Sequence, residues 1–252
     1  MLEVKKVYKT YPKAGKGFRK ERLSVLADVS FQIHAGDWAA LVGESGSGKS
    51  TLSRLILGLE KADSGSLLLE GENPAAWRKE KRGQMSVVFQ DYTSSANPAF
   101  QIKDIIMEPL KAFSRNHPIQ ETAESLMEKV GLSKELAERY PHELSGGQLQ
   151  RVCIARAIST KPKFLVLDEA VSSLDVSVQA QILDLLDTLK KEMDMTCLFI
   201  AHDLQTVAYL CNQVMFLNEG KIVEQIETKN LANVQSAYAK RLLEAVVRFR
   251  VE

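Results

Sequence analysis

The sequence predicts an α/β fold in which helices cover a parallel sheet, with an antiparallel β subdomain at the N-terminus and a helical insertion in the middle of the chain. Two short apolar runs, Phe164 to Leu167 and Leu198 to Ala201, suit central strands that are buried on both faces. Residues 178–191, between these runs, have the apolar spacing of a helix. Residues 91–159 carry several helix-spaced apolar groups and no strand-like run.

The bulk composition limits the class of protein. The chain has 252 residues, of which 45% are hydrophobic and 26% are charged, as in an ordinary globular protein. The net charge of +1 and a pI of about 7.7 give no broad basic field, so we expect no nucleic-acid partner. We find neither an apolar run near the roughly 18 residues of a membrane span nor the apolar core of a signal peptide. We therefore expect a cytoplasmic protein, and any membrane span would belong to a partner chain.

The N-terminal part predicts short strands. Residues 2–7 alternate between polar and apolar side chains, residues 23–33 are rich in β-forming types, and residues 38–42 form an apolar run that ends at Gly43. The stretch 12–22 between the first two strands is rich in glycine and basic residues. We interpret it as a solvated hairpin tip.

Strand and helix then alternate along the core. Residues 49–58 have helical spacing, whereas 66–71 and 84–89 return to strand character. Near the end, the runs 214–217 and 221–224 flank the turn Asn218-Glu219-Gly220 and predict a hairpin.

These elements predict two parts of the chain. Residues 1–90 and 160–252 form the core with its antiparallel β subdomain, and residues 91–159 form the helical subdomain. Residues of chemically versatile types that lack a motif are expected to be structural: Cys153, Cys197 and Cys211 as buried thiols, Trp38 and Trp77 as packing residues, and His34, His117 and His142 as surface or packing residues.

The strongest motif is a phosphate-binding loop. The segment Gly43-Glu44-Ser45-Gly46-Ser47-Gly48-Lys49-Ser50, followed by Thr51, fits G-x-x-x-x-G-K-[ST] and lies between a predicted strand and a predicted helix. Glycines let backbone N–H groups turn toward phosphate oxygens at the N-terminus of the helix. Lys49 would add a charge near the β- and γ-phosphates, and Ser50 would ligate Mg²⁺.

Two carboxylates follow the predicted strand 164–167. Asp168 and Glu169 lie at its C-terminal end, where sheets of this kind bind ligands. Asp168 would hold Mg²⁺, and Glu169 would polarise the water that attacks the γ-phosphate. An apolar run before Asp-Glu is a weak signal alone and gains meaning from the phosphate loop.

A second glycine-rich segment opens a predicted helix. Leu144-Ser145-Gly146-Gly147-Gln148 precedes the helix-spaced residues from Leu149 onward, so Ser145 and the glycine N–H groups can meet an anion at a helix N-terminus. Asp168 follows Gln148 by 168 − 148 = 20 residues, which leaves room for one helix and a turn into the next strand.

With these motifs the sequence resembles ATP-binding-cassette (ABC) ATPase subunits over essentially its whole length. The resemblance implies that Gln90 reaches the Mg²⁺ and the attacking water, and that His202 contacts the γ-phosphate. Ser172-Ser173-Leu174-Asp175 is similar to the segment that crosses to the opposing subunit, so Asp175 is expected near ATP. Tyr11 is the candidate for stacking on adenine, and plain strand packing is the alternative.

The resemblance also implies an assembly. Two ATPase subunits pair head to tail, and each ATP with its Mg²⁺ lies between residues 43–51 of one subunit and residues 145–148 of the other. Hydrolysis removes the γ-phosphate contacts, so the pair opens and moves two integral membrane permeases docked on the helical subdomain. An extracellular substrate-binding protein would take part indirectly. The chain is therefore expected at the cytoplasmic face of the membrane.

Further segments are similar to the ATPases of peptide and nickel importers, namely Tyr140-Pro141-His142-Glu143 and residues 238–246. Asp168-Glu169-Ala170-Val171-Ser172, with alanine where most relatives have proline, is most similar to the second ATPase subunit of nickel and metal-chelate (metallophore) importers. This favours a non-identical ATPase partner. The alternatives are an ABC ATPase of DNA repair or translation and the ATPase of another ABC membrane complex. No cysteine-rich extension of the kind found in some peptide-importer ATPases is expected.

Overall fold

The structure is a computed structural model that describes residues 1–13, 22–113, 122–172 and 174–248. The chain forms two compact units, the first of Met1–Glu80 with Leu198–Glu252 and the second of Lys81–Cys197. The predicted hairpin tip is largely outside the described residues, as are His117 and Ser173. The predicted subdomain boundaries after residues 90 and 159 remain a prediction.

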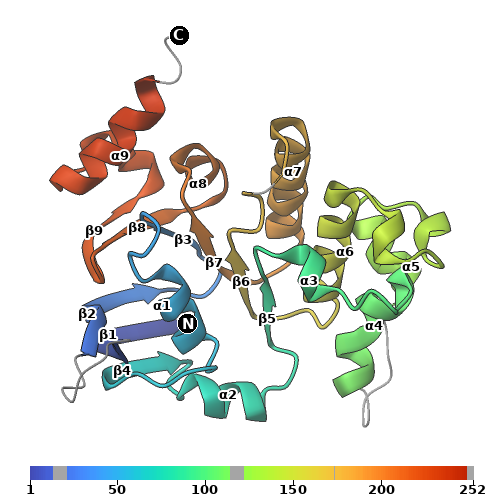
Figure 1. The fold of residues 1–252 in the computed structure, drawn as a ribbon, viewed down its shortest axis with the longest axis horizontal. Helices are drawn as coiled ribbons and strands as arrows, with labels where there is room; N and C mark the ends of the chain where they lie inside the picture. Colours follow the sequence, from blue (N-terminus) through green and yellow to red (C-terminus); the bar gives the residue numbers. More distant parts are fainter. Residues whose placement is uncertain (14–21, 114–121, 173, 249–252) are drawn as a thin grey trace. The chain divides into compact units, whose positions relative to one another are not determined.

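An antiparallel sheet forms the N-terminal part of the first unit. It consists of β1 (Leu2–Pro12), β2 (Arg22–Ile33) and β4 (Ser64–Leu69). The strand order is β2-β1-β4 with antiparallel pairing on both sides of β1, as the blue and cyan strands of Figure 1 show. Leu2, Val4 and Val7 of β1 are buried. The predicted antiparallel β subdomain is confirmed.

A second group of strands in this unit carries the phosphate loop. It contains β3 (Trp38–Val42), β7 (Thr196–Ala201) from Leu198 onward, β8 (Gln213–Asn218) and β9 (Lys221–Glu227), in the order β7-β3-β8-β9. Strands β3 and β8 are parallel, and β8 and β9 form the predicted antiparallel hairpin. Every residue of β3 is buried, as expected for a central strand.

The helices of the first unit include some that the sequence did not reveal. They are α1 (Lys49–Ile56), α2 (Pro74–Glu80), α8 (Leu204–Leu210), the 3₁₀ segment Thr228–Asn233 and α9 (Ala237–Arg248). Only α1 was predicted. Helices α2 and α8 have seven residues each, which is too short for a clear helical period. Helix α9 packs on α8 and β8 (Figure 1).

The second unit is mainly helical. Its strands β5 (Met85–Val88) and β6 (Phe164–Asp168) pair in parallel. Its helical segments are α3 (Tyr92–Ser95), α4 (Ile102–Phe113), α5 (Ala123–Lys129), the 3₁₀ turns Lys134–Leu136 and Pro141–Glu143, α6 (Gly146–Ile158) and α7 (Val176–Glu192). Within the described part of 91–159 there is no strand, so the predicted helical character of this region is confirmed.

Residues without a motif occupy structural positions. Trp38 and Trp77 are fully buried, as predicted for packing residues. Cys153, Cys197 and Cys211 are buried and not in disulfides, which confirms that prediction. His34 and His142 are exposed. Across the ranges that the structure describes, no helix combines the length and the apolar character needed to cross a membrane.

Candidate nucleotide-binding site

The phosphate loop joins β3 to α1, as the motif predicts. Gly48 is the N-cap of α1 and has a φ of 110°. A side chain there would place its Cβ 2.9 Å from the Val25 carbonyl oxygen and 2.8 Å from Leu26 Cδ2. Glycine is therefore required by backbone conformation and by space, and it lets the loop turn tightly into the helix.

The hairpin turn between β8 and β9 braces this loop. The Gly220 amide donates to the Ser47 carbonyl oxygen at 3.0 Å, and the Ala27 amide of β2 donates to the Gly220 carbonyl oxygen at 2.8 Å. The buried Ser47 hydroxyl has no hydrogen-bond partner within the described chain. A buried hydroxyl without a partner is costly, and a phosphate oxygen is one group that could supply it.

Lys49 lies inside the loop. Its Nζ donates to the carbonyl oxygens of Gly43 at 2.7 Å and of Glu44 at 3.1 Å, and the residue is only 6% exposed. The ammonium group is therefore fixed where the loop curls. Of the next two residues in α1, Ser50 is exposed and Thr51 is buried.

Tyr238 of α9 also contacts the loop, and the sequence analysis did not assign it to the site. Its hydroxyl oxygen accepts a hydrogen bond from the Glu44 amide at 2.9 Å, and the residue is 5% exposed. Burial raises the pKa of the Tyr238 hydroxyl above its ordinary value, so the group stays a neutral phenol. The two partners are 194 positions apart in the sequence, which explains why no local pattern revealed the contact.

We expect Tyr238→Phe to raise the KM for ATP about 2- to 10-fold with little change in kcat, because it removes one hydrogen bond that fixes the loop. Steady-state ATPase kinetics of the full chain would measure this. Tyr209→Phe is the matched control, since Tyr209 is an exposed residue of α8. An unchanged KM would show that α9 does not contribute to the position of the loop.

Tyr11 lies near the end of β1 and is partly exposed. Its hydroxyl donates to the Glu60 carboxylate, and the Lys9 ammonium lies 5.2 Å from the centre of its ring. Burial and then the Glu60 carboxylate raise the pKa of the Tyr11 hydroxyl. The ring is not fully packed within the sheet, and its stacking on adenine remains a prediction.

His202 directly follows β7 and is exposed. The next residue, Asp203, is the N-cap of α8 and accepts hydrogen bonds from the amides of Gln205 at 3.1 Å and Thr206 at 3.0 Å. Burial opposes ionisation of Asp203, but the hydrogen bonds from Thr206 outweigh it and keep the pKa of Asp203 below its ordinary value. This cap fixes the turn in which His202 lies.

In the second unit, Gln90 and Glu169 lie together. Strands β5 and β6 are parallel, with Val88 opposite Leu167, so the residues after them meet at one edge. The Gln90 side-chain amide donates to Glu169 Oε2 at 2.9 Å. Glu169 has a φ of 49°, the left-handed region that side-chain-bearing residues rarely adopt. Asp168 ends β6 and is partly buried.

The segment after Gln90 is fixed by a helix cap. Asp91 accepts hydrogen bonds from the Thr93 hydroxyl at 2.6 Å and the Ser94 amide at 3.0 Å. The Thr93 hydroxyl and then the Ser94 amide lower the pKa of Asp91 to about 2. The chain therefore turns into α3 immediately beyond Gln90.

The second glycine-rich segment starts α6 as predicted. The Ser145 hydroxyl accepts from the Gln148 amide at 3.3 Å, and Gln148 Oε1 accepts from the Ser145 amide at 2.9 Å. A Cβ on Gly147 would lie 2.5 Å from Val178 Cγ1 of α7, and one on Gly146 would lie 2.7 Å from the Tyr92 hydroxyl oxygen. The glycines thus allow close packing of α6.

Asp175 occupies the N-cap position of α7, yet its side chain makes no capping hydrogen bond. It is exposed.

The predicted site residues are divided between the two units. The first unit contains the phosphate loop, Tyr11 and His202, and the second contains Gln90, Asp168, Glu169, Asp175 and residues 145–148.

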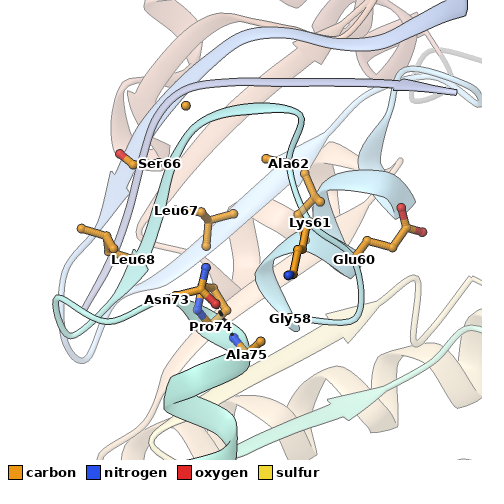
Figure 2. Close-up of a pocket in the computed structure, with 12 residues that line it drawn as sticks. Gly58, Glu60, Lys61, Ala62, Ser66, Leu67, Leu68, Asn73, Pro74 and Ala75 are labelled. Carbon is orange, nitrogen blue, oxygen red and sulfur yellow. Dashed lines mark hydrogen bonds between the residues drawn. The ribbon is translucent and has the colours of Figure 1, made fainter.

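The first unit also has a cavity of about 320 Å³ at the C-terminal end of α1, beside β4 and the start of α2. Figure 2 shows Lys61, Leu67 and Pro74 around it, with the Asn73 side chain accepting from the Ala75 amide. None of the predicted site residues lines this cavity. The nearby Glu60 carboxylate is paired with Tyr11 and Arg54.

Comparison with protein families identifies the chain. Residues 26–172 match the family described as ABC transporter. The chain belongs to the ABC transporter family. Among curated ABC proteins it is 44% identical to the metal-staphylopine import system ATP-binding protein CntF of Staphylococcus aureus, over 99% of this chain and 100% of that protein. It is 40% identical to the nickel import ATP-binding protein NikE of Rhodospirillum rubrum, over 97% of this chain and 90% of that one.

A third ABC relative is the oligopeptide transport ATP-binding protein OppF of Haemophilus influenzae, with 42% identity over 90% of this chain and 71% of that protein. A solved ABC cassette, MJ0796 as a dimer in a post-hydrolysis state bound to ADP and phosphate, has a TM-score of 0.79 and 27% identity, over 90% of this chain and 99% of that one. The predicted ABC ATPase fold is confirmed, as is the resemblance to the ATPases of peptide and nickel importers. The chain is an ABC ATPase that binds and hydrolyses ATP.

Proposed function

We propose that this ATPase powers an importer of nickel or metal-chelate (metallophore) substrates, with oligopeptides as the second candidate cargo, through partner permeases. The observation that supports this best is the similarity to the metal-staphylopine import ATPase, which runs over both chains from end to end. This chain has alanine at position 170, where most similar ABC ATPases have proline, and this difference supports the same class.

The phosphate loop is the proposed binding site for the ATP phosphates. Residues 43–51 would surround the β- and γ-phosphates, with Lys49 and backbone amides of the loop facing them, except the Glu44 amide, which donates to Tyr238. Tyr11 would stack on adenine. Mg²⁺ takes oxygen ligands, and the hydroxyl of Ser50, the amide oxygen of Gln90 and the carboxylate of Asp168 are such donors. The ion, when bound, would neutralise charge that develops on the transferred phosphoryl group.

Hydrolysis is proposed to depend on three side chains. Glu169 would polarise the attacking water. Gln90, which donates to the Glu169 carboxylate, would help to orient the same water molecule. His202 would contact the γ-phosphate from the turn that Asp203 fixes. Glu169 and His202 directly follow a strand, and Gln90 is the second residue after β5, so all three lie where a ligand can be reached.

The proposed working state is a head-to-tail pair of ATPase subunits. Residues 145–148 would bind the ATP held by the partner, and the exposed Asp175 would reach the same interface. We propose a non-identical second ATPase, two permeases, and an extracellular binding protein that acts indirectly, with this chain on the cytoplasmic face of the membrane and Mg²⁺ as cofactor. The segment from Asp91 to Leu110 is the proposed permease contact, because it follows Gln90 directly.

The test is to purify the complex from cells that express its neighbouring genes and to measure its subunits and its transport. We expect two different ATPases with two permeases, and ATP-dependent uptake of chelated nickel by vesicles that contain the complex. Uptake of oligopeptides instead would favour the second cargo. A stable complex with this ATPase alone would contradict the heterodimer, and transport of neither cargo would contradict the proposed class.

A further inference from the structure

Gln150 is a buried amide that the proposed mechanism does not yet use. It lies in α6, two residues after Gln148, and is fully shielded from solvent. Its Nε2 donates to the Ala170 carbonyl oxygen at 2.6 Å. Its Oε1 is buried and has no hydrogen-bond partner in the described part of the chain. The amide therefore makes one short, directed contact and leaves its acceptor unused.

That contact holds the turn that carries Glu169. Ala170 directly follows Glu169, whose φ of 49° is sterically unfavourable and must be maintained by the surrounding structure. On the other side, the Glu169 carbonyl oxygen accepts from the Ser172 amide at 3.2 Å and the Ser172 hydroxyl at 2.9 Å. Both carbonyl groups of the turn are thus fixed, one from within the turn and one from α6.

The incomplete pairing of Gln150 indicates what the residue contributes. An unsatisfied buried acceptor lowers stability, and an apolar side chain of the same size would fill the space without that cost. What an apolar side chain could not do is donate to the Ala170 carbonyl. The specific feature of Gln150 is therefore the direction of this donor and not its packing.

We infer that Gln150 is a positioning residue for hydrolysis, which acts by fixing the turn at Ala170 and thereby the carboxylate of Glu169. The inference rests on the proposed role of Glu169. Because Ser145 and Gln148 form the first turn of the same helix, Gln150 also joins the segment that would meet the partner's ATP to the turn that would polarise water. Gln150 does not itself contact the reacting atoms.

The test compares Gln150→Met, which keeps the length of the side chain and removes the donor, with Gln150→Glu, which replaces the donor by a carboxylate oxygen. We expect kcat to fall roughly 10- to 100-fold in the Met variant and further in the Glu variant, with KM for ATP within about 2-fold of the parent. The reason is that a misplaced base stabilises the transition state less well but hardly changes the binding of ATP. Gln181→Glu, the same change on an exposed residue of α7, is the matched control and should leave both parameters unchanged.

A second measurement separates this role from a general structural one. Glu169→Gln is expected to trap an ATP-stabilised dimer with the proposed partner ATPase, and the double variant Gln150→Met/Glu169→Gln should form that dimer equally well. Thermal melting of each full-length variant checks that it is folded. If the Met variant is unfolded, the isosteric Glu variant is used for the test in its place. Parent-like kcat in a folded Gln150 variant, or a loss that appears in KM or in dimer formation, would overturn the inference. Normal turnover by Glu169→Gln alone would instead contradict the proposed function.

Discussion

Replacing Glu169 with glutamine is expected to stop ATP turnover while ATP still binds. Glutamine keeps the shape of the side chain, but it loses the carboxylate that would polarise the attacking water. Removing a general base costs about 10²- to 10⁴-fold in rate. The Gln90 amide, which donates to Glu169 Oε2 at 2.9 Å, can still donate to the amide oxygen of the variant, so the local structure should persist.

The measurement is steady-state ATP hydrolysis together with ATP binding and size-exclusion chromatography in the presence of MgATP. The sample contains this chain together with its proposed partner ATPase. Unhydrolysed ATP would keep the γ-phosphate between the two subunits, so their dimer should accumulate. Glu128→Gln is a suitable control, because it makes the same change on an exposed residue of α5. Failure of the Glu169 variant to bind ATP would show that this carboxylate has a different role.

Replacing Lys49 with alanine is expected to weaken ATP binding and abolish hydrolysis. The side chain is the cation of the phosphate loop, and hydrogen bonds from a charged donor contribute about 1.5 to 3 kcal/mol each. Loss of one such bond corresponds to roughly a 10- to 150-fold increase in the dissociation constant for ATP. The variant also loses the two contacts of Nζ with the carbonyl oxygens of Gly43 and Glu44, so the loop itself should become less ordered.

Equilibrium binding of ATP and steady-state hydrolysis would measure this effect, with far-ultraviolet circular dichroism to verify the fold. Lys61→Ala is the matched control, because Lys61 is an exposed lysine that follows the same helix. Normal ATP turnover by a folded Lys49→Ala variant would show that the phosphate loop is not part of the ATP-binding site.

The parts of the fold that the sequence predicted are those where local rules are strong. Gly48 and Lys49 mark a strand, a glycine turn and a helix within one short segment, and the structure has all three. The helix-spaced residues from Leu149 onward predicted a helix after the second glycine-rich segment, and in the structure Ser145 and Gln148 cap its start. The hairpin at Gly220 followed from two apolar runs around a turn.

Other features depend on contacts between distant residues and leave no periodic trace. The hydrogen bond from Gln150 to Ala170 spans 20 residues and joins a helix to a turn. The left-handed conformation of Glu169 is also hidden from the sequence, because glycine or asparagine would normally mark such a position. Side-chain hydrogen bonds of this kind are set by tertiary packing, which a single sequence does not disclose.

The braces on the phosphate loop affect the entropy of nucleotide binding. Tyr238 holds the Glu44 amide at one end of the loop and Gly220 holds the Ser47 carbonyl group near the other, and both bonds join groups of the protein itself. The conformational freedom of the loop is thus already reduced when the protein folds, so ATP need not order it on arrival. In amide hydrogen exchange of the nucleotide-free protein, the N–H groups of Glu44 and Gly220 should therefore exchange slowly for a surface loop.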